Sequence, residues 1–516
     1  MKVTYLGHAG FLVETPLSLF LIDPWLTSQG AYHAAWFQYP CNHHIEQPLL
    51  ASLRTANKSL YVYISHEHQD HYDVEFLSKI LDFNPYFILP RFSTKAFEFL
   101  THLYPSNQIS FLRDEKTYQG EDFAVTIFLE ESGLNRDSAI LVNCQKFSFL
   151  NLNDCKIFDR IHNLKTTKID IFSTQFSGAT WHPICYDYEQ EDHQKISVNK
   201  RLQKFKNVAK ALEFLQPSIF IPSVGPCCFL DDNLFHLNFD TNGIFPTAEE
   251  FINWLEENTK LKDTQNIHLL PGDSLTLPNL EIEVTEQLFD YRNRPKEEYL
   301  LDYQKNVDKS IQLLYYKYSQ TEPIAVFKSL GRELQLKCQA LGVTTIENRC
   351  LYFGLNELPN LFWKVDLLKQ KVAEIHEIQE QEFYSITVPA WQVERVLNRE
   401  IHWEDFCLSF RARLQRIPDT YSIIWNLFLF RNPDELTWAA KSLEMLEQKN
   451  SRVSVVCPTT AKQWEINQYC PHQGADLSNA CVEEGKYLIC PRHGWKFNLE
   501  EDGKLTPNGK FSVNAK

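Results

Sequence analysis

The sequence predicts an α/β domain, followed by a mainly helical region and a small all-β domain. The chain has 516 residues, which is too long for one hydrophobic core. Short β-rich runs alternate with helical patterns up to about residue 285, and long amphipathic helices then continue to about residue 450. A segment rich in turn residues closes the chain. We therefore place the domains at 1–285, 286–450 and 451–516.

The first of these domains has the pattern of a sheet covered by helices. Its β-rich runs include YVYISH and IFIPS, and its helical stretches include TAEEFINWLEEN. One helical stretch, NKRLQKFKNVAK from Asn199 to Lys210, is rich in basic residues. These residues fit a solvated helix face, and the alternative is that they meet a substrate phosphate.

Composition and charge exclude several classes of protein. The net charge of −15 opposes bulk nucleic-acid binding, because phosphates are neutralised by clustered Lys and Arg. The longest strongly apolar run, Ser422 to Phe430, is far shorter than the ~20 residues of a membrane-spanning helix. The first residues, MKVTYLGHAGFLVE, alternate like a strand and do not resemble a signal peptide. We expect a cytoplasmic protein with no membrane or nucleic-acid partner.

The carboxy-terminal stretch CPHQGADLSNACVEEGKYLICPRHGWKFN contains two pairs of metal ligands. Cys470 and His472 form a C-x-H pair, and Cys490 and His493 form a C-x-x-H pair. These four ligands could hold a zinc ion, but structural zinc sites usually show C-x-x-C hairpins or helical H-x(3–5)-H pairs. The spacing instead suits a Rieske [2Fe–2S] cluster, in which two cysteines hold one iron and two histidines hold the other. Such a cluster relays electrons.

The sequence around these ligands strengthens this interpretation. CPHQGADL and CPRHGWKF resemble the two cluster loops of Rieske domains of the oxygenase and ferredoxin type. Gly474 and Gly494 would permit tight turns near the cluster. Cys481 lies outside the pattern, and we expect it only to be packed.

A second group of potential ligands directly follows the apolar run YVYIS. The stretch SHEHQDHYD offers His66, His68, Asp70 and His71. Side chains at alternate positions after a strand can converge on one metal ion, and the next two residues can reach a second ion. The alternative is a set of solvated histidines in a loop.

This H-x-H-x-D-H run resembles the signature of the metallo-β-lactamase superfamily. The preceding stretches YLGHAGFLVE and LFLIDPWL resemble the opening of its ascorbate-6-phosphate lactonase branch. The resemblance implies an αββα sandwich for residues 1–285. It also implies that His66 and His68 bind one metal, that Asp70 and His71 bind another, and that Asp154 bridges both.

The sequence departs from the zinc hydrolases of this superfamily at two further ligand positions. Where those enzymes have histidines, this chain offers carboxylates, namely Glu130, Glu131 or Asp137 at the first position and Asp273 at the second. His102 falls in a predicted helix, and His268 is displaced by five residues. Two histidines and a carboxylate with open positions are typical of non-heme Fe(II) enzymes that activate O₂. We therefore predict non-heme Fe(II), as one or two ions.

The presence of both sites in one chain predicts a monooxygenase. A Rieske cluster delivers electrons, which a hydrolase does not use. An iron centre that inserts one atom of O₂ into a substrate needs two electrons from outside. The chain has no G-x-G-x-x-G loop for a nucleotide cofactor, so the electrons must come from a separate protein.

Several other stretches resemble the CMP-N-acetylneuraminate hydroxylase family, including NRDSAILVN, FIPSVGPCCFLDDNLFHLN and HLLPGDSL. That family combines a Rieske domain with a metallo-β-lactamase-like domain, but the animal members carry the Rieske domain first. The resemblance implies hydroxylation of a small polar substrate such as a CMP-sialic acid-like sugar nucleotide, or oxidation of an amine nitrogen. It also implies a reductase that acts through cytochrome b5 or a ferredoxin.

Two other functions are open. The first is a zinc- or manganese-dependent hydrolase with a Rieske domain that senses redox state. The second is an electron carrier with a degenerate amino-terminal domain. We expect the middle region to bridge the two metal domains or to form a subunit interface. If one chain cannot bring the cluster near the iron, a head-to-tail homo-oligomer could do so.

Overall fold

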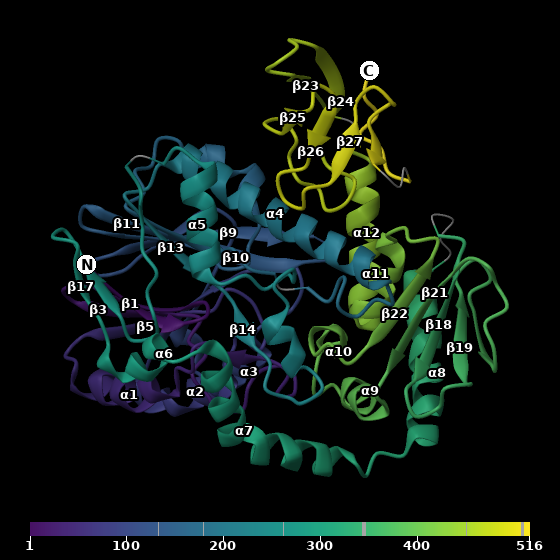
Figure 1. Ribbon diagram of the computed structural model, residues 1–516, viewed down its shortest axis with the longest axis horizontal. Coiled ribbons are helices and arrows are strands. Elements are labelled where there is room, and N and C mark those ends of the chain that lie inside the picture. Colours follow the sequence, from purple (N-terminus) through teal and green to yellow (C-terminus); the bar gives the residue numbers. More distant parts are fainter. Residues whose placement is uncertain (133, 179, 262, 343–346, 450, 507–509) are drawn as a thin grey trace. The chain divides into compact units, whose positions relative to one another are not determined.

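The computed structural model describes residues 1–132, 134–178, 180–261, 263–342, 347–449, 451–506 and 510–516. Figure 1 shows its helices and strands, coloured along the sequence. The contacts between residues divide the chain into two units. The first unit comprises Met1–Glu131, Arg136–Gly178 and Ser197–Ile311. The second unit comprises Ser132–Asn135, Ala179–Ile196 and Gln312–Lys516.

The first unit is built on a pair of facing β-sheets. The first sheet has the strand order β17-β16-β1-β2-β3-β5-β6-β7, and the second has the order β15-β13-β12-β11-β10-β9-β8. The strands of the first sheet are β1 (Lys2–Gly7), β2 (Gly10–Glu14), β3 (Ser18–Ile22), β5 (Ser59–Tyr63), β6 (Tyr86–Pro90), β7 (Ile109–Leu112), β16 (Ser274–Thr276) and β17 (Glu281–Glu283). Those of the second sheet are β8 (Lys116–Gln119), β9 (Ala124–Glu131), β10 (Arg136–Cys144), β11 (Phe147–Asn151), β12 (Ile171–Gln175), β13 (Ile219–Ser223) and β15 (Gln265–Asn266). A short pair, β4 (Phe37–Gln38) and β14 (Cys227–Cys228), lies outside both sheets.

The core between the sheets is formed by alternate residues of their strands. Phe20 and Ile22 of β3 are buried there, in one cluster with Val125 of β9 and Val142 of β10. Successive side chains of a strand point to opposite faces, so every second residue of β3 enters this core. Each fully buried side chain of this size contributes roughly 1.5–3 kcal/mol through the hydrophobic effect.

Helices cover the outer faces of both sheets. Leu19 and Leu21, the other residues of β3, pack with Leu49 of α1. On the far side of the second sheet, Phe172 of β12 packs with Phe205 of α4. Helix, sheet, sheet and helix thus follow one another, which confirms the predicted αββα sandwich. The helices that lie wholly in this unit are α1 (Glu46–Thr55), α2 (Val74–Lys79), α3 (Glu98–Leu103), α5 (Ala248–Asn258) and α6 (Phe289–Asn293). Helices α4 (Gln190–Leu215) and α7 (Lys296–Tyr318) lie mostly in it and extend into the second unit.

Parallel strands bring distant parts of the sequence to one edge of the sandwich. Strands β3, β5 and β6 run parallel to one another, as do β11, β12 and β13. Parallel strands share their carboxyl edge, which is where α/β proteins commonly place ligand sites. Asp23 follows β3, His66 follows β5 and Asp154 follows β11.

The middle region of the second unit is helical, as predicted, but it also contains a sheet of strand order β20-β19-β18-β21-β22. The sequence predicts only one strand-like stretch there, Phe383 to Asn398. The strands are β18 (Cys350–Leu355), β19 (Phe362–Asp366), β20 (Lys371–Ile375), β21 (Phe383–Val388) and β22 (Arg413–Ile417). The helices are α8 (Pro323–Leu341), α9 (Ala390–Leu397), α10 (Asp405–Leu408), α11 (Ile423–Phe430) and α12 (Pro433–Glu447). Among the described residues, no helix is both long and apolar enough to span a membrane.

The carboxy-terminal segment is built from short antiparallel strands around its own core. Trp464, Leu488 and Phe497 are buried in this core together with Cys470 and Cys490. The strands are β23 (Arg452–Val456), β24 (Gln463–Asn467), β25 (Cys481–Glu483), β26 (Tyr487–Ile489), β27 (Lys496–Asn498) and β28 (Lys504–Thr506).

Candidate metal centres

The H-x-H-x-D-H run lies in a tight turn at the carboxyl end of β5. Buried Asp23 accepts hydrogen bonds from the backbone N–H of Ser65 at 2.8 Å and from its hydroxyl at 2.6 Å. The chain then reverses, because the N–H groups of His71 and Tyr72 both donate to the carbonyl of His68. This turn directs the side chains of the run toward one place.

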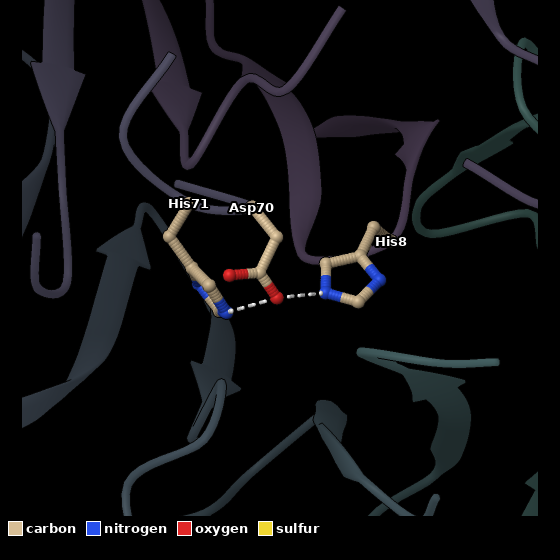
Figure 2. A group of neighbouring side chains, drawn as sticks. All are labelled: His8, Asp70 and His71. Atoms are coloured by element: carbon tan, nitrogen blue, oxygen red, sulfur yellow. Dashed lines mark hydrogen bonds and ion pairs between the residues drawn. The ribbon is translucent and has the colours of Figure 1, made fainter. Parts of the chain in front are cut away.

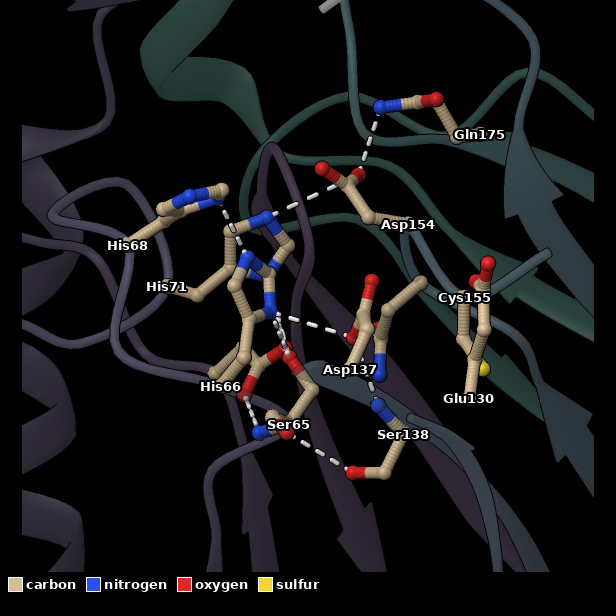
Figure 3. Close-up of polar contacts among 12 residues, drawn as sticks. Ser65, His66, His68, His71, Glu130, Asp137, Ser138, Asp154, Cys155 and Gln175 are labelled. Atoms are coloured by element: carbon tan, nitrogen blue, oxygen red, sulfur yellow. Dashed lines mark hydrogen bonds and ion pairs between the residues drawn. The ribbon is translucent and has the colours of Figure 1, made fainter. Parts of the chain in front are cut away.

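The first group of candidate ligands is His66, His68 and Asp154, which Figure 3 shows together. One ligand atom from each residue lies within 4.8 Å of the others. The ring nitrogens Nε2 of His66 and Nδ1 of His68 are 2.7 Å apart. Two imidazoles and one carboxylate thus converge, as the superfamily resemblance implied for these residues.

The second group is His8, Asp70 and His71, all of them buried (Figure 2). Nε2 of His8 lies 2.9 Å from Oδ2 of Asp70, and Nε2 of His71 lies 3.8 Å from the same oxygen. Nε2 of His71 is also 3.7 Å from Oδ1 of Asp154, which belongs to the first group. The two groups are therefore neighbours in one centre.

His8 is not among the ligands predicted from the sequence. His8 lies in the two-residue turn between β1 and β2, where Gly7 pairs with Gly10. Its backbone carbonyl accepts hydrogen bonds from the Tyr5 hydroxyl at 3.0 Å and from the Val224 N–H at 2.8 Å. The sequence signal for His8 is the stretch Gly-His-Ala-Gly between two apolar strands. A two-residue turn between paired strands holds its histidine in a defined position.

Carboxylates behind the histidines orient two of the rings. Asp137 Oδ1 is 3.2 Å from Nδ1 of His66, and Asp23 Oδ2 is 2.8 Å from Nδ1 of His71. With Nδ1 of each ring held this way, Nε2 is the nitrogen that faces the centre. Metal-binding histidines commonly donate their second ring N–H to a carboxylate in this manner. Asp137, which the sequence suggested as a ligand, is therefore placed as an orienting residue.

Replacement of Asp137 by asparagine tests this arrangement. The change keeps the side-chain shape and removes the charge next to His66, so we expect the metal affinity of this centre to fall roughly 10–100-fold. Competition with a chelator would measure the affinity. The matched control is Asp122→Asn, because Asp122 accepts hydrogen bonds from Leu17 and Ser18 and contacts neither group. An affinity equal to that of the unchanged protein would contradict the orienting role.

The electrostatics of the centre favour a cation. Burial raises the pKa of Asp70, but the charges of His71 and His8 outweigh it and lower that pKa well below its usual value. Burial lowers the pKa of His71, yet Asp70, Asp154 and Asp23 outweigh it and raise that pKa to about 10. The buried carboxylates thus attract positive charge, which a metal ion would supply in place of a proton.

The structure does not bring the remaining predicted residues into either group. Glu130 accepts a hydrogen bond from the Lys156 N–H at 2.7 Å, beside the centre. The carboxylate of Glu131 binds the backbone and hydroxyl of Ser93. Asp273 directly precedes β16 and forms an ion pair with Arg292 at 3.0 Å.

A basic residue of α4 reaches the centre indirectly. Lys204 donates to the side-chain oxygen of Gln175, and the Gln175 amide donates to Asp154 at 2.6 Å. Burial and the charge of Lys156 together lower the pKa of Lys204 to about 7, although the charge of Asp154 opposes this. Lys204 belongs to the basic stretch Asn199–Lys210. At least this basic residue of the stretch therefore points toward the candidate site and not into solvent.

The carboxy-terminal ligands lie on two loops with the same hydrogen-bond pattern. In the first loop, the N–H of Cys470 donates to Ala475 and the N–H of Gly474 donates back to Cys470. In the second loop, the N–H of Cys490 donates to Trp495 and the N–H of Gly494 donates back to Cys490. Gly474 and Gly494 have φ of 71° and 69°, a left-handed conformation that glycine adopts without strain.

The donor set on these loops fits a Rieske cluster. Cys470 and Cys490 are buried, and the rings of His472 and His493 are 4.6 Å apart. Burial raises the pKa of the Cys470 thiol well above its usual value, whereas the hydrogen bond with Cys470 lowers the pKa of Cys490. The thiolate is the form that binds metal, so a cluster would have to displace the proton of Cys470. Cys481, in contrast, is exposed, so the expectation that it is packed was wrong.

Comparison with solved structures gives low similarity scores. Residues of this chain match a diiron β-hydroxylase, CmlA from Streptomyces venezuelae, at 12% identity and a TM-score of 0.32, over 52% of each chain. They also match Igni18, a metallo hydrolase from Ignicoccus hospitalis, at 14% identity and a TM-score of 0.34, over 54% of this chain and 98% of that one. The order of the sheets and the family match, rather than these likenesses, support the fold assignment.

Relatives are similar over most of the chain. A protein of Mycolicibacterium smegmatis, whose name describes it as a Rieske 2Fe-2S iron-sulfur protein, is 26% identical over 99% of this chain and 98% of its own. The cytidine monophosphate-N-acetylneuraminic acid hydroxylase of Xenopus laevis is 23% identical over 84% of this chain and 72% of its own.

Family models match both ends of the chain. The model described as Rieske [2Fe-2S] domain matches residues 433–511, and the model described as beta-lactamase superfamily domain matches residues 2–138. The chain therefore joins an amino-terminal beta-lactamase superfamily domain to a carboxy-terminal Rieske [2Fe–2S] domain, and it resembles Rieske iron-sulfur proteins and, at lower identity, CMP-N-acetylneuraminate hydroxylases.

Proposed function

We propose that this protein is a Rieske-dependent non-heme iron monooxygenase. One observation carries the proposal: each group of the amino-terminal centre offers two imidazoles and one carboxylate, in a chain that also contains a Rieske domain. Two histidines and one carboxylate are the protein ligands of Fe(II) oxygenases. The neighbouring groups would hold one or two Fe(II) ions.

The proposed reaction consumes O₂, two electrons and two protons. One oxygen atom enters the substrate as a hydroxyl, or is bound to an amine nitrogen, and the other leaves as water. Iron held by the two groups would supply the O₂ chemistry, and the cluster held by Cys470, His472, Cys490 and His493 would supply the electrons one at a time.

The residues around the centre position its ligands and limit the access of water. The Tyr32 hydroxyl donates to Asp70 at 2.6 Å, which leaves the second oxygen of this carboxylate facing His8 and His71. Trp25 is almost fully buried, and its ring meets the edge of His8 at 5.2 Å between centroids. An apolar wall of this kind strengthens electrostatic interactions inside the centre.

The substrate is proposed as a small polar molecule, for example a CMP-sialic acid-like sugar nucleotide or an amine. Lys204 supports an anionic group on it, because this cation lies one hydrogen-bonded residue away from Asp154. The names of the more distant relatives support the sugar nucleotide. The electron donor would be a separate reductase with cytochrome b5 or a ferredoxin. A homo-oligomer stays a prediction.

Metal content and oxygen uptake test the proposal together. We expect protein purified without air to contain more than the two irons of the cluster per chain and to show a Rieske signal in reduced-state EPR. It should also consume O₂ when reductant and substrate are both present. Two irons together with zinc or manganese, and substrate turnover without O₂ uptake, would contradict the monooxygenase.

The second candidate function is a zinc- or manganese-dependent hydrolase with a redox-sensing Rieske domain. Two imidazoles and one carboxylate also occur as the protein ligands of catalytic zinc, so the donor set of each group permits it. The metal content and the need for O₂ in the same experiment distinguish the two functions.

A further inference from the structure

One ligand of the cluster contacts a tyrosine outside the matched Rieske segment. The Tyr421 hydroxyl lies 3.2 Å from Nε2 of His472, and the two ring centroids are 5.1 Å apart. Both residues belong to the second unit. The Rieske family match begins at residue 433, so this contact comes from the middle region.

This contact determines which nitrogen of His472 faces the cluster. Nε2 is directed at Tyr421, so Nδ1 is the nitrogen on the side of the cluster loops. A neutral imidazole that binds iron through Nδ1 carries its proton on Nε2, and that N–H donates to the Tyr421 oxygen. An acceptor at the second nitrogen makes a ligating imidazole more basic.

Stacked rings fix the plane of the imidazole. Trp495 lies parallel to His472, with centroids 4.2 Å apart and an interplanar angle of 4°. Tyr421 meets Trp495 nearly edge-on, at 5.7 Å and 82°. His472 is therefore held by Trp495 on one face and by Tyr421 at the Nε2 edge.

A buried ion pair holds the loop that carries Tyr421. Arg349 and Glu347 are both buried and form two hydrogen bonds of 2.9 Å. Arg349 also donates to the Thr420 hydroxyl at 2.8 Å, and the Tyr384 hydroxyl donates to the Thr420 carbonyl at 2.6 Å.

The residue after Tyr421 is fixed as well. The Ser422 hydroxyl accepts a hydrogen bond from the Trp425 N–H at 3.2 Å and so caps the start of α11. Tyr421 thus lies between two anchored neighbours, and its hydroxyl has a defined position relative to His472.

We propose that Tyr421 is a positioning residue for the Rieske cluster, which fixes the tautomer of His472 and lowers the reduction potential of the cluster. A more basic imidazole stabilises the oxidised iron more than the reduced iron, because the oxidised form carries the larger positive charge. The inference rests on the Rieske domain alone. It holds or fails independently of the reaction at the amino-terminal centre.

The Tyr421→Phe variant tests the proposal, because it removes one oxygen atom and keeps the ring. At a fixed ambient potential, we expect the ratio of oxidised to reduced cluster to fall about tenfold, which is an upward shift of about 59 mV for one electron. A spectroelectrochemical titration would measure the ratio. The g-values of the reduced cluster should also change, since the ligand ring loses one of its two constraints.

The matched control is Tyr384→Phe, which removes a hydrogen bond from the same loop and leaves the Tyr421 hydroxyl in place. A shift in Tyr421→Phe that clearly exceeds the shift in Tyr384→Phe supports the proposal. An unchanged or lowered potential in Tyr421→Phe overturns it. Equal shifts in both variants also overturn it, because displacement of the loop would then explain them.

The unsubstituted protein offers a measurement that needs no variant. In the inferred tautomer, the Nε2–H of buried His472 donates to the Tyr421 oxygen, so we expect at least one ligand N–H to exchange slowly with deuterium. Proton hyperfine spectra of the reduced cluster in H₂O and D₂O would detect it. Complete exchange of all ligand N–H protons within the mixing time would contradict the hydrogen bond.

Discussion

The Cys490→Ser protein should contain no [2Fe–2S] cluster and show no reductant-driven oxygen uptake, while it still binds metal at its amino-terminal centre. Cys490 is buried in the core of the carboxy-terminal segment and offers one of the two thiolates of the cluster. A serine hydroxyl stays protonated at neutral pH and replaces a thiolate poorly. Loss of the cluster would remove the electrons that the proposed reaction needs.

The matched control for this variant is Cys481→Ser. Cys481 is exposed at the start of β25 and lies outside both cluster loops, so its replacement should leave the sulfide content and the Rieske EPR signal unchanged. Sulfide analysis, EPR and an oxygen electrode would give the three readouts. Substrate turnover at the normal rate in cluster-free Cys490→Ser protein would exclude the monooxygenase and favour the hydrolase.

The His8→Ala and His68→Ala proteins should each lose metal from a different group of the amino-terminal centre. His8 belongs only to the group with Asp70 and His71, and His68 belongs only to the group with Asp154. If two iron ions are bound, each variant should retain about one iron fewer per chain. Loss of a direct ligand should weaken binding by more than the roughly 10–100-fold that follows loss of an outer-shell partner.

Iron analysis of these variants also separates a one-iron centre from a two-iron centre. With one iron in the group of His66, the His68→Ala protein loses it and the His8→Ala protein keeps it. The control is His102→Ala, because His102 lies exposed on α3, away from both groups. Normal iron content and normal oxygen uptake in both ligand variants would contradict the proposed centre.

The residues that could be predicted from sequence are those in short, dense motifs. His66, His68, Asp70 and His71 lie within six consecutive positions, and the four Rieske ligands lie within two short loops of matching sequence. Local spacing is sufficient for such motifs, because the backbone turn that brings the ligands together is part of the motif.

Residues that join the centre through strand pairing could not be predicted in the same way. His8 meets Asp70 across 62 positions, only because β1 and β2 lie in the same sheet as β5. Asp273 has a suitable residue type and an approximate position, but Arg292 and the backbone N–H of Thr285 bind its carboxylate. Which carboxylates remain for a metal depends on such distant partners, and the sequence does not show them.

Asp137 illustrates an intermediate case. Asp137, which lies on β10, is among the candidate ligands predicted from the sequence, but its role depends on the direction in which the His66 ring points. Because Nδ1 of His66 faces Asp137, the carboxylate lies behind the histidine and not beside the metal position. A direct ligand and an orienting residue differ by only a few ångströms in the position of the carboxylate. The residue type alone does not show this difference.

The position of His8 in the chain has a consequence for the order in which the protein matures. His8 lies in the turn between β1 and β2, and Nε2 of its ring meets the carboxylate of Asp70, which is 62 positions away in the sequence. Contacts between residues so far apart in the sequence form late in folding. The second group is therefore complete only when the strands of the first sheet have paired, so iron would enter a scaffold that has already folded. A folded apoprotein would then be the species that takes up iron, rather than an unfolded chain that the metal causes to fold.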